Sequence, residues 1–134
     1  MFPNGKDPIL IVDDDADDRY IILEAFRENQ CEKPCMPLEN GDQLMEFLHA
    51  MPEKESPSLI VLDLNMPGKD GKQALKEIKQ DPRFQHIPTV ILTTSASLKE
   101  KNQVYSLGAN CFITKPGRYK EFLEIIKSIS HIWC

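Results

Sequence analysis

Hydrophobic residues in this chain are arranged in two ways: in short unbroken runs, and in longer stretches where apolar positions recur every three or four residues. The unbroken runs are ILIV at 9–12, LIVL at 59–62, TVIL at 89–92 and CFIT at 111–114. Runs without polar alternation are typical of strands in a parallel sheet that is covered on both faces. A weaker run at 36–39 predicts one more strand, the second in chain order.

The stretches between these strands have the periodicity of helices. The first covers residues 16–29. Ser97 or its neighbour is placed to cap the fourth helix, and Gly108 to end it. Asn40-Gly41 predicts a turn before the second helix, and residues 52–57 predict a polar loop after it. The apolar stripes of the second, third and fifth helices are Leu44, Phe47, Leu48 and Met51; Ala74, Leu75 and Ile78; and Phe122, Ile125, Ile126, Ile129 and Trp133.

This regular alternation of strands and helices defines the fold class. Strands that are each followed by a helix predict an α/β protein with a doubly wound, five-stranded parallel sheet and helices on both faces. The 134 residues suffice for one domain with its own core, and no linker, repeat or low-complexity tract divides them. We therefore expect a single domain over residues 1–134.

Polar side chains follow four of the predicted strands directly. Asp13 and Asp14 follow the first strand, Asp63 the third, Thr93 the fourth and Lys115 the fifth. Ligands of open α/β sheets bind outside the carboxyl ends of the strands. We therefore expect three carboxylates, a hydroxyl and an ammonium to converge in one crevice.

The three carboxylates of this group predict a magnesium site. Like charges repel by about 4 kcal/mol per pair at 4 Å and an effective dielectric near 20, and a divalent cation relieves that repulsion. Mg²⁺ prefers hard oxygen ligands and keeps several waters. We expect Asp14 and Asp63 to be direct ligands, Asp13 to act through a bound water, and Asn65 to supply its backbone carbonyl.

Asp63 is the expected phosphoryl acceptor, because it ends its strand between two leucines and would form an aspartyl phosphate. Phosphoryl transfer depends mainly on positioning and charge neutralisation. Lys115 would neutralise phosphoryl oxygens from one side. The Thr93 hydroxyl would bond one of those oxygens.

Acidic residues after strands also have a simpler explanation as turn formers or helix caps. Asp15, Asp17 and Asp18 are interpreted in this way. Thr93 alone would be an ordinary strand residue, and Lys115 alone a solvated charge. The functional interpretation rests on their combination.

The overall charge limits the classes of partner. The net charge is −5 and 28% of residues are charged, with no dense basic cluster, so we expect no nucleic-acid partner. The segment MFPNGKDP has no basic head followed by an apolar stretch, and no run reaches membrane-spanning length. We expect a cytoplasmic protein with no membrane contact.

The cysteines lack the spacing of a metal site. Cys31, Cys35, Cys111 and Cys134 form no C-x-x-C pair. In a cytoplasmic protein we expect four free, reduced thiols. The three histidines lie outside the motifs.

Four motifs together resemble the receiver domains of two-component response regulators. They are VDDD (12–15), DLNMPGKDG (63–71), LTTS (92–95) and TKP (114–116), and the resemblance covers residues 7–131. The spacing from acceptor to hydroxyl and from hydroxyl to lysine is similar to the family's usual spacing. The longer interval before the acceptor, together with LTTS, resembles the stand-alone regulators that are paired with bacterial phytochromes.

The resemblance implies a flavodoxin-like fold with strand order 2-1-3-4-5 and a phosphorylation switch. A sensor histidine kinase, in this subgroup a phytochrome-like one, donates its phosphoryl group to Asp63 and Thr93 moves toward the new oxygens. Phe112 occupies the position of the family's switch aromatic and would turn inward. The changed surface would be residues 97–131. The Lys115-Pro116 bond resembles one that is often cis in the family, and the sequence leaves its isomer open.

We expect no output domain after the core, and therefore expect the partner to be a downstream protein target or a phosphotransfer protein. A homodimer contact near Trp133 is left open. The protein would not be an enzyme beyond its own phosphoryl transfer and dephosphorylation. Two alternatives remain: a phosphorylation-independent docking protein with a receiver fold, and a phosphohydrolase. One large family of aspartyl phosphohydrolases has a second acid two residues after the nucleophile, where this chain has Asn65.

Overall fold

The computed structural model describes residues 7–134. Most of the segment MFPNGKDP, for which the sequence predicted no basic head followed by an apolar stretch, lies outside the described residues. Strands and helices alternate throughout, as predicted. Their bounds are β1 (Ile9–Val12), α1 (Ala16–Glu28), β2 (Cys35–Leu38), α2 (Gly41–Ala50), β3 (Leu59–Leu62), α3 (Gly71–Gln80), β4 (Thr89–Thr93), α4 (Leu98–Leu107), β5 (Cys111–Thr114) and α5 (Tyr119–Trp133).

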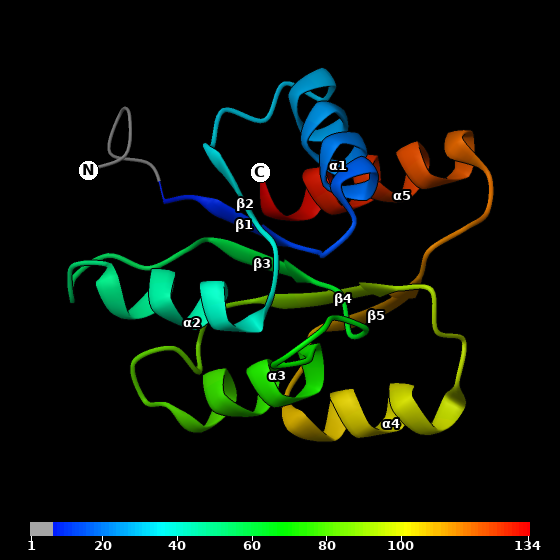
Figure 1. Ribbon diagram of the computed structural model, residues 1–134. Helices are drawn as coiled ribbons and strands as arrows, with labels where there is room; N and C mark the ends of the chain where they lie inside the picture. Colours follow the sequence, from blue (N-terminus) through cyan, green and yellow to red (C-terminus); the bar gives the residue numbers. More distant parts are fainter. Residues whose placement is uncertain (1–6) are drawn as a thin grey trace.

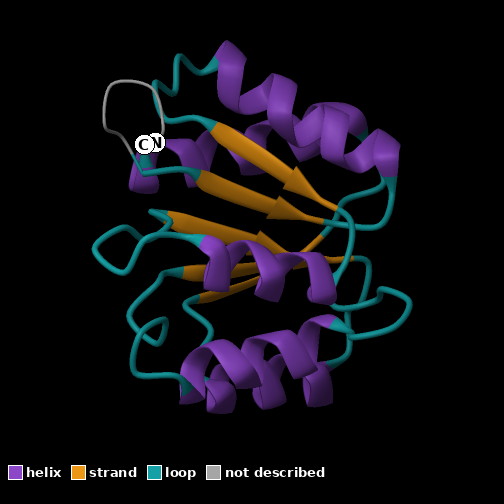
Figure 2. Cartoon of the chain, turned by 60° about the vertical axis from the view of Figure 1, so that its left-hand side comes forward, coloured by secondary structure: helices purple, strands orange, loops and turns teal. Residues whose placement is uncertain are grey.

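All neighbouring strands pair in parallel, in the order β2-β1-β3-β4-β5. Helices α1 and α5 lie together on one face of the sheet, and α2, α3 and α4 cover the other (Figure 1). A second view shows the strands as the middle layer between these two groups of helices (Figure 2). The doubly wound, flavodoxin-like fold with order 2-1-3-4-5 is confirmed.

The two faces of the sheet carry separate cores because successive side chains of a strand point to opposite faces. One core lies under α2, α3 and α4, and the other lies under α1 and α5. The buried strand residues of the first are Leu10, Val12, Leu38, Ile60, Leu62 and Ile91. Those of the second are Ile9, Ile11, Leu59, Val61, Val90 and Leu92. Burial on both faces explains why these strands are apolar without alternation.

Local hydrogen bonds start and end the helices largely as predicted. Ser97 caps α4 by accepting a hydrogen bond from the Glu100 N–H, and Gly108 ends that helix in the left-handed conformation. The predicted turn at Asn40-Gly41 is wrong. Asn40 is instead the N-cap of α2, where its side chain accepts from the Gln43 N–H, and Gly41 is the first helical residue.

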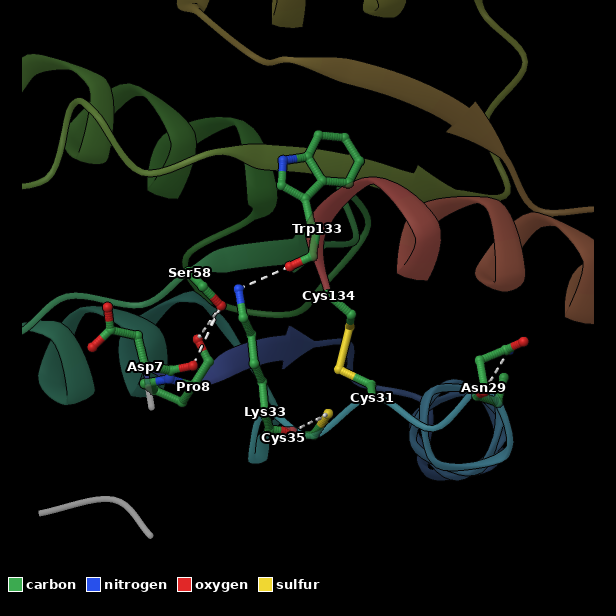
Figure 3. Close-up of a disulfide and its surroundings, with 10 residues drawn as sticks. Asp7, Pro8, Asn29, Cys31, Lys33, Cys35, Ser58, Trp133 and Cys134 are labelled. Atoms are coloured by element: carbon green, nitrogen blue, oxygen red, sulfur yellow. Dashed lines mark hydrogen bonds between the residues drawn. A yellow bond between two sulfur atoms is a disulfide. The ribbon is translucent and has the colours of Figure 1, made fainter. Parts of the chain in front are cut away.

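The structure also decides the state of the cysteines and the isomer of the Lys115-Pro116 bond. The expectation of four free thiols is wrong for Cys31 and Cys134, which form a disulfide (Figure 3). Cys35 and Cys111 are free thiols. The Lys115-Pro116 bond is trans, since residues 7–134 contain no cis peptide bond. No helix in that part of the chain is both long and apolar enough to cross a membrane.

Candidate phosphoryl-acceptor site

The predicted site residues lie where the carboxyl ends of β1, β3, β4 and β5 meet. Asp13 and Asp63 directly follow their strands and are 2% and 6% exposed, while Asp14, the next residue after Asp13 in the loop before α1, is exposed. Thr93 is the last residue of β4 and is fully buried. Lys115 directly follows β5. The fold therefore brings all five residues to one edge of the sheet.

Three carboxylates are close enough to share one cation. Asp13, Asp14 and Asp63 each offer a carboxylate oxygen, and these atoms lie within 4.8 Å of one another. All three donors are hard oxygens, which Mg²⁺ and Mn²⁺ prefer. The arrangement fits the divalent cation that the sequence predicted.

Lys115 neutralises the buried part of this cluster. Its Nζ lies 2.6 Å from an oxygen of Asp13, 2.8 Å from one of Asp18 and 3.4 Å from one of Asp63. Burial alone would lower the pKa of Lys115, but its bonds to Asp13 and Asp18 and the charges of Asp13 and Asp63 raise that pKa above its usual value. Lys115 is therefore a fixed positive charge in the site.

Asp13 combines burial with close charges of both signs. Burial raises its pKa to about 6, and the nearby charge of Asp63 acts in the same direction. The bonds from Lys115 and from the Asp15 N–H oppose that rise. A carboxylate held in this way gains from a cation, because a positive charge favours its ionised form.

Asp18 is a site residue that the sequence reasoning missed. It was interpreted as a cap or turn former, but the cap of α1 is Asp15, whose side chain accepts from the Asp17 and Asp18 N–H groups. The Asp18 carboxylate instead reaches Lys115. A usable pattern was present, because an acid in the first turn of a helix that starts at the site is placed to face it.

The Thr93 hydroxyl connects two loops beside the acidic cluster. Its oxygen lies 3.5 Å from the side-chain nitrogen of Asn65 and 3.4 Å from the backbone nitrogen of Ser95, both of which donate to it. The Asn65 N–H in turn donates to Asp63 at 3.3 Å. Thr93 thus contacts both the loop that carries the expected acceptor and the loop that leads to α4.

Tight packing fixes the loop that carries Asp63. The Asp63 N–H donates to the Val12 carbonyl, and the Gly71 N–H donates to the Leu64 carbonyl. A Cβ atom at position 71 would collide with the backbone oxygen of Asp63, so glycine is required at the start of α3. These contacts hold the loop that carries the Asp63 carboxylate in position beside Lys115.

Phe112 lies on β5, away from the acidic cluster. Its side chain is half-buried and packs against the core under α2, α3 and α4. Its backbone N–H donates to the Tyr105 hydroxyl of α4 at 3.0 Å. The predicted switch aromatic is therefore in direct contact with the helix that follows the Thr93 loop.

The fold and this constellation are those of a response regulator receiver domain. The chain matches the model of that family over residues 9–127, and it belongs to the family.

Its relatives include the response regulator Rcp1 of Synechocystis sp., which is 36% identical over 133 residues, covering 97% of this chain and 90% of Rcp1. The crystal structure of the phosphorylated cyanobacterial phytochrome response regulator RcpA is 34% identical, with a TM-score of 0.88 over 96% of this chain and 94% of that one. The Mn²⁺-bound form of Rcp1 is 35% identical, with a TM-score of 0.87 over 95% and 94%. The predicted resemblance to receivers, and to phytochrome response regulators among them, is confirmed.

Proposed function

We propose that this protein accepts a phosphoryl group from a sensor histidine kinase onto Asp63 in a Mg²⁺-dependent reaction. The phosphorylated form would then signal to a partner protein through the face formed by α4, β5 and α5. One observation carries the proposal: the Asp63 carboxylate lies 3.4 Å from Lys115 Nζ, within a group of acids that fits a divalent cation. The family membership and the phosphorylated state of the relative RcpA support it.

In the reaction, a carboxylate oxygen of Asp63 attacks the phosphorus of a phosphohistidine. The P–O bond to Asp63 forms as the P–N bond breaks, and the imidazole leaves with the electron pair of that bond. Lys115 stabilises the charge on the transferred oxygens, and the fixed Asp63 loop supplies the positioning on which this chemistry depends. The protein would not turn over an external substrate.

The metal would be held by the oxygens of Asp14 and Asp63, by Asp13 through a bound water, and by the backbone carbonyl of Asn65. When bound, Mg²⁺ neutralises charge on the phosphoryl oxygens and on the crowded carboxylates. The Mn²⁺-bound form of Rcp1 supports a divalent cation in a protein of this kind.

The switch would start at Thr93. If its hydroxyl turns to a phosphoryl oxygen, the hydrogen bond from the Ser95 N–H is lost, and the loop before α4 is released on that side. Phe112 would then move inward, which changes the contact between its N–H and Tyr105. Both changes alter the surface of α4 and β5.

The kinase partner would be phytochrome-like, as the description of RcpA suggests. The downstream partner would be a target protein or a phosphotransfer protein. We place the protein in the cytoplasm, where the donor kinase obtains its phosphoryl group from ATP.

The test is to incubate the protein with acetyl phosphate, with and without Mg²⁺, and to weigh the intact wild type and Asp63→Asn under mild conditions. We expect one phosphoryl adduct that requires Mg²⁺ and is absent from the variant. An adduct that persists in Asp63→Asn would move the acceptor to another residue. No adduct under any condition would favour the phosphorylation-independent docking protein.

Lys115→Ala separates acceptance of phosphate from the response to it. We expect this variant still to form the adduct. On phosphorylation, however, the rates of amide exchange in α4 should change less in the variant than in wild type. Moving a two-state switch from 1:99 to 99:1 requires about 5.5 kcal/mol of differential stabilisation, and loss of one charge contact removes part of that. An unaltered exchange response would contradict the coupling through Lys115.

A further inference from the structure

The Cys31–Cys134 disulfide joins segments far apart in the chain, at the opposite end of the sheet from the acidic site. Cys31 follows α1 and Cys134 follows α5, with a sequence separation of 103 residues. Their Cα atoms are 5.5 Å apart, a distance that suits a disulfide without movement of the backbone. The bond lies near the start of β2 and the segment before β1, as Figure 3 shows. It connects the far ends of the two helices that cover this face.

The bond is open to attack from solvent. Cys134 is exposed and Cys31 is half-buried, and both line a surface cavity of about 460 Å³ together with Lys33 and Glu32. The Lys33 ammonium lies in this cavity and donates to the backbone oxygen of Trp133 at 2.9 Å. A nearby cation stabilises a thiolate, which is the form in which a cysteine leaves or attacks. Accessible disulfides of this kind are reducible, unlike those closed inside a core.

The two remaining thiols are poor exchange partners for this bond. Cys35 lies nearest in the chain, but burial raises the pKa of its thiol to about 11, so it stays protonated. Its sulfur donates to the Lys33 carbonyl. Cys111 lies on β5, and β1, β3 and β4 separate that strand from β2 in the sheet. The disulfide therefore has two states, closed and open, without competing pairings inside the chain.

Opening the bond would loosen the last turn of α5 rather than the core. Ile129 and Ser130 are buried, whereas Ile132 beyond them is 68% exposed. With the disulfide open, the hydrogen bond from Lys33 to the Trp133 oxygen and the bond from the Cys134 N–H to the Ser130 oxygen remain as local ties. Both are near the surface and are weak against water.

We propose that Cys31–Cys134 is a reversible redox site, opened by a dithiol reductant and closed by a disulfide oxidant, that controls how firmly the end of α5 is held. A reductant thiolate attacks Sγ of Cys134, the exposed residue of the pair, and Cys31 leaves as a thiolate and takes up a proton. The second thiol of the reductant then breaks the mixed disulfide. One protein S–S bond becomes two thiols, while the reductant's two thiols become one disulfide. The site acts independently of phosphorylation.

The test is a titration of the full chain in dithiothreitol redox buffers without denaturant. Open and closed forms are counted by alkylation of thiols and intact mass. Trp133, the single tryptophan of the chain, adjoins Cys134 and reports opening by its fluorescence. We expect full, reversible opening, a rise in Trp133 emission, and a melting temperature lower by about 10 °C in the open form, since closing so long a loop constrains the unfolded chain.

Cys31→Ser and Cys134→Ser should each melt like the open form of wild type and show no redox response. Each variant leaves one cysteine of the pair for glutathione disulfide to modify. Cys134, which remains in Cys31→Ser, should react faster than Cys31, which remains in Cys134→Ser, because Cys134 is exposed. Cys35→Ser and Cys111→Ser are the matched controls and should keep the full response.

Three results would overturn the proposal: four alkylatable thiols under every oxidising condition, a bond that opens only in denaturant, or a disulfide that forms between two chains instead. None of these readouts depends on phosphorylation. The redox site and the proposed function can therefore fail separately.

Discussion

The two helices that flank β5 are held to the molecule in different ways. α5 buries Phe122, Ile126, Ile129 and Ser130 and is joined to the α1 side by a disulfide. α4 buries Val104 alone. Elements with few buried apolar residues open at lower free energy than those anchored in the core. The proposed switching face of α4, β5 and α5 therefore combines one firmly anchored helix with one that has fewer buried contacts.

Polar contacts supplement the small share that α4 has in the core. The Ser95 hydroxyl donates to Glu100 at 3.1 Å, and Glu100 lies 3.6 Å from the Lys72 ammonium of α3. Tyr105 accepts from the Phe112 N–H. Each contact contributes little free energy but has a defined direction. In the proposed switch, a small change at Thr93 would redistribute these contacts of α4 while α5 stays in place.

The largest expected difference comes from truncating one core residue in each helix. Ile126→Ala should lower the free energy of unfolding by about 3 kcal/mol, and Val104→Ala by about 2 kcal/mol, because fewer methyl groups are lost. Both side chains are fully buried. Urea denaturation measures both values. If Val104→Ala lowers the free energy of unfolding as much as Ile126→Ala does, α4 is anchored as firmly as α5, contrary to the difference described above.

Tyr105→Phe removes the hydrogen bond between α4 and β5 while keeping the ring. The Phe112 N–H loses its acceptor, and we expect a loss of about 1 kcal/mol in unfolding free energy together with faster amide exchange at Phe112. Tyr119→Phe is the matched control on α5, since Tyr119 is 57% exposed. It should change stability by less than about 0.5 kcal/mol. Equal effects of the two variants would show that the Tyr105 hydroxyl does not join the two elements.

Asp18→Asn tests how the α1 side holds Lys115. In the proposed reaction, Asp18 competes with the phosphoryl group for the Lys115 ammonium. Its loss should therefore speed adduct formation from acetyl phosphate about threefold. This rate change corresponds to an activation free energy lower by about 0.7 kcal/mol, as expected for a partly exposed pair. Asp17→Asn, in the same turn but exposed, should leave the rate unchanged. A slower rate in Asp18→Asn would mean that Asp18 positions Lys115 for the reaction instead.

Glu100→Gln should have the smallest effect on stability, a few tenths of a kcal/mol, because its pair with Lys72 is partly exposed. In this variant the rate of amide exchange should nevertheless rise along α4 but not along α5. Glu124→Gln is the exposed control on α5. Exchange that rises equally in both helices would contradict a local role for Glu100.

The sequence predicted strands with an unbroken apolar run more accurately than the edge strand β2 and the contacts between distant segments. β1, β3 and β5 begin and end at the predicted residues, and β4 runs one residue further, to Thr93. β2 begins one residue earlier than predicted. It is a half-exposed edge strand that contains Pro37, so its pattern is weak. Asn40 resembled a turn residue because the same side-chain oxygen that makes a turn also caps a helix.

The site could be predicted because its residues each end a strand, and the topology alone brings such residues together. The role of Asp18 was missed, although its place in the first turn of a helix that starts at the site was a usable pattern. The disulfide could not be predicted. Its cysteines share no motif, and only the packing of α1 against α5 brings them together.

Pro37 has a consequence for association between molecules. The carbonyls of Pro34 and Leu38 accept hydrogen bonds from β1, so residue 37 between them faces away from the sheet, where proline offers no N–H. At the opposite margin, the outward Phe112 N–H is already bonded to Tyr105. An exposed strand edge is a template for adding a strand from another chain, and proline or a covering side chain prevents it. Both margins of the sheet thus resist aggregation by strand addition, which lets concentrated protein stay dispersed while its helical surfaces remain available to partners.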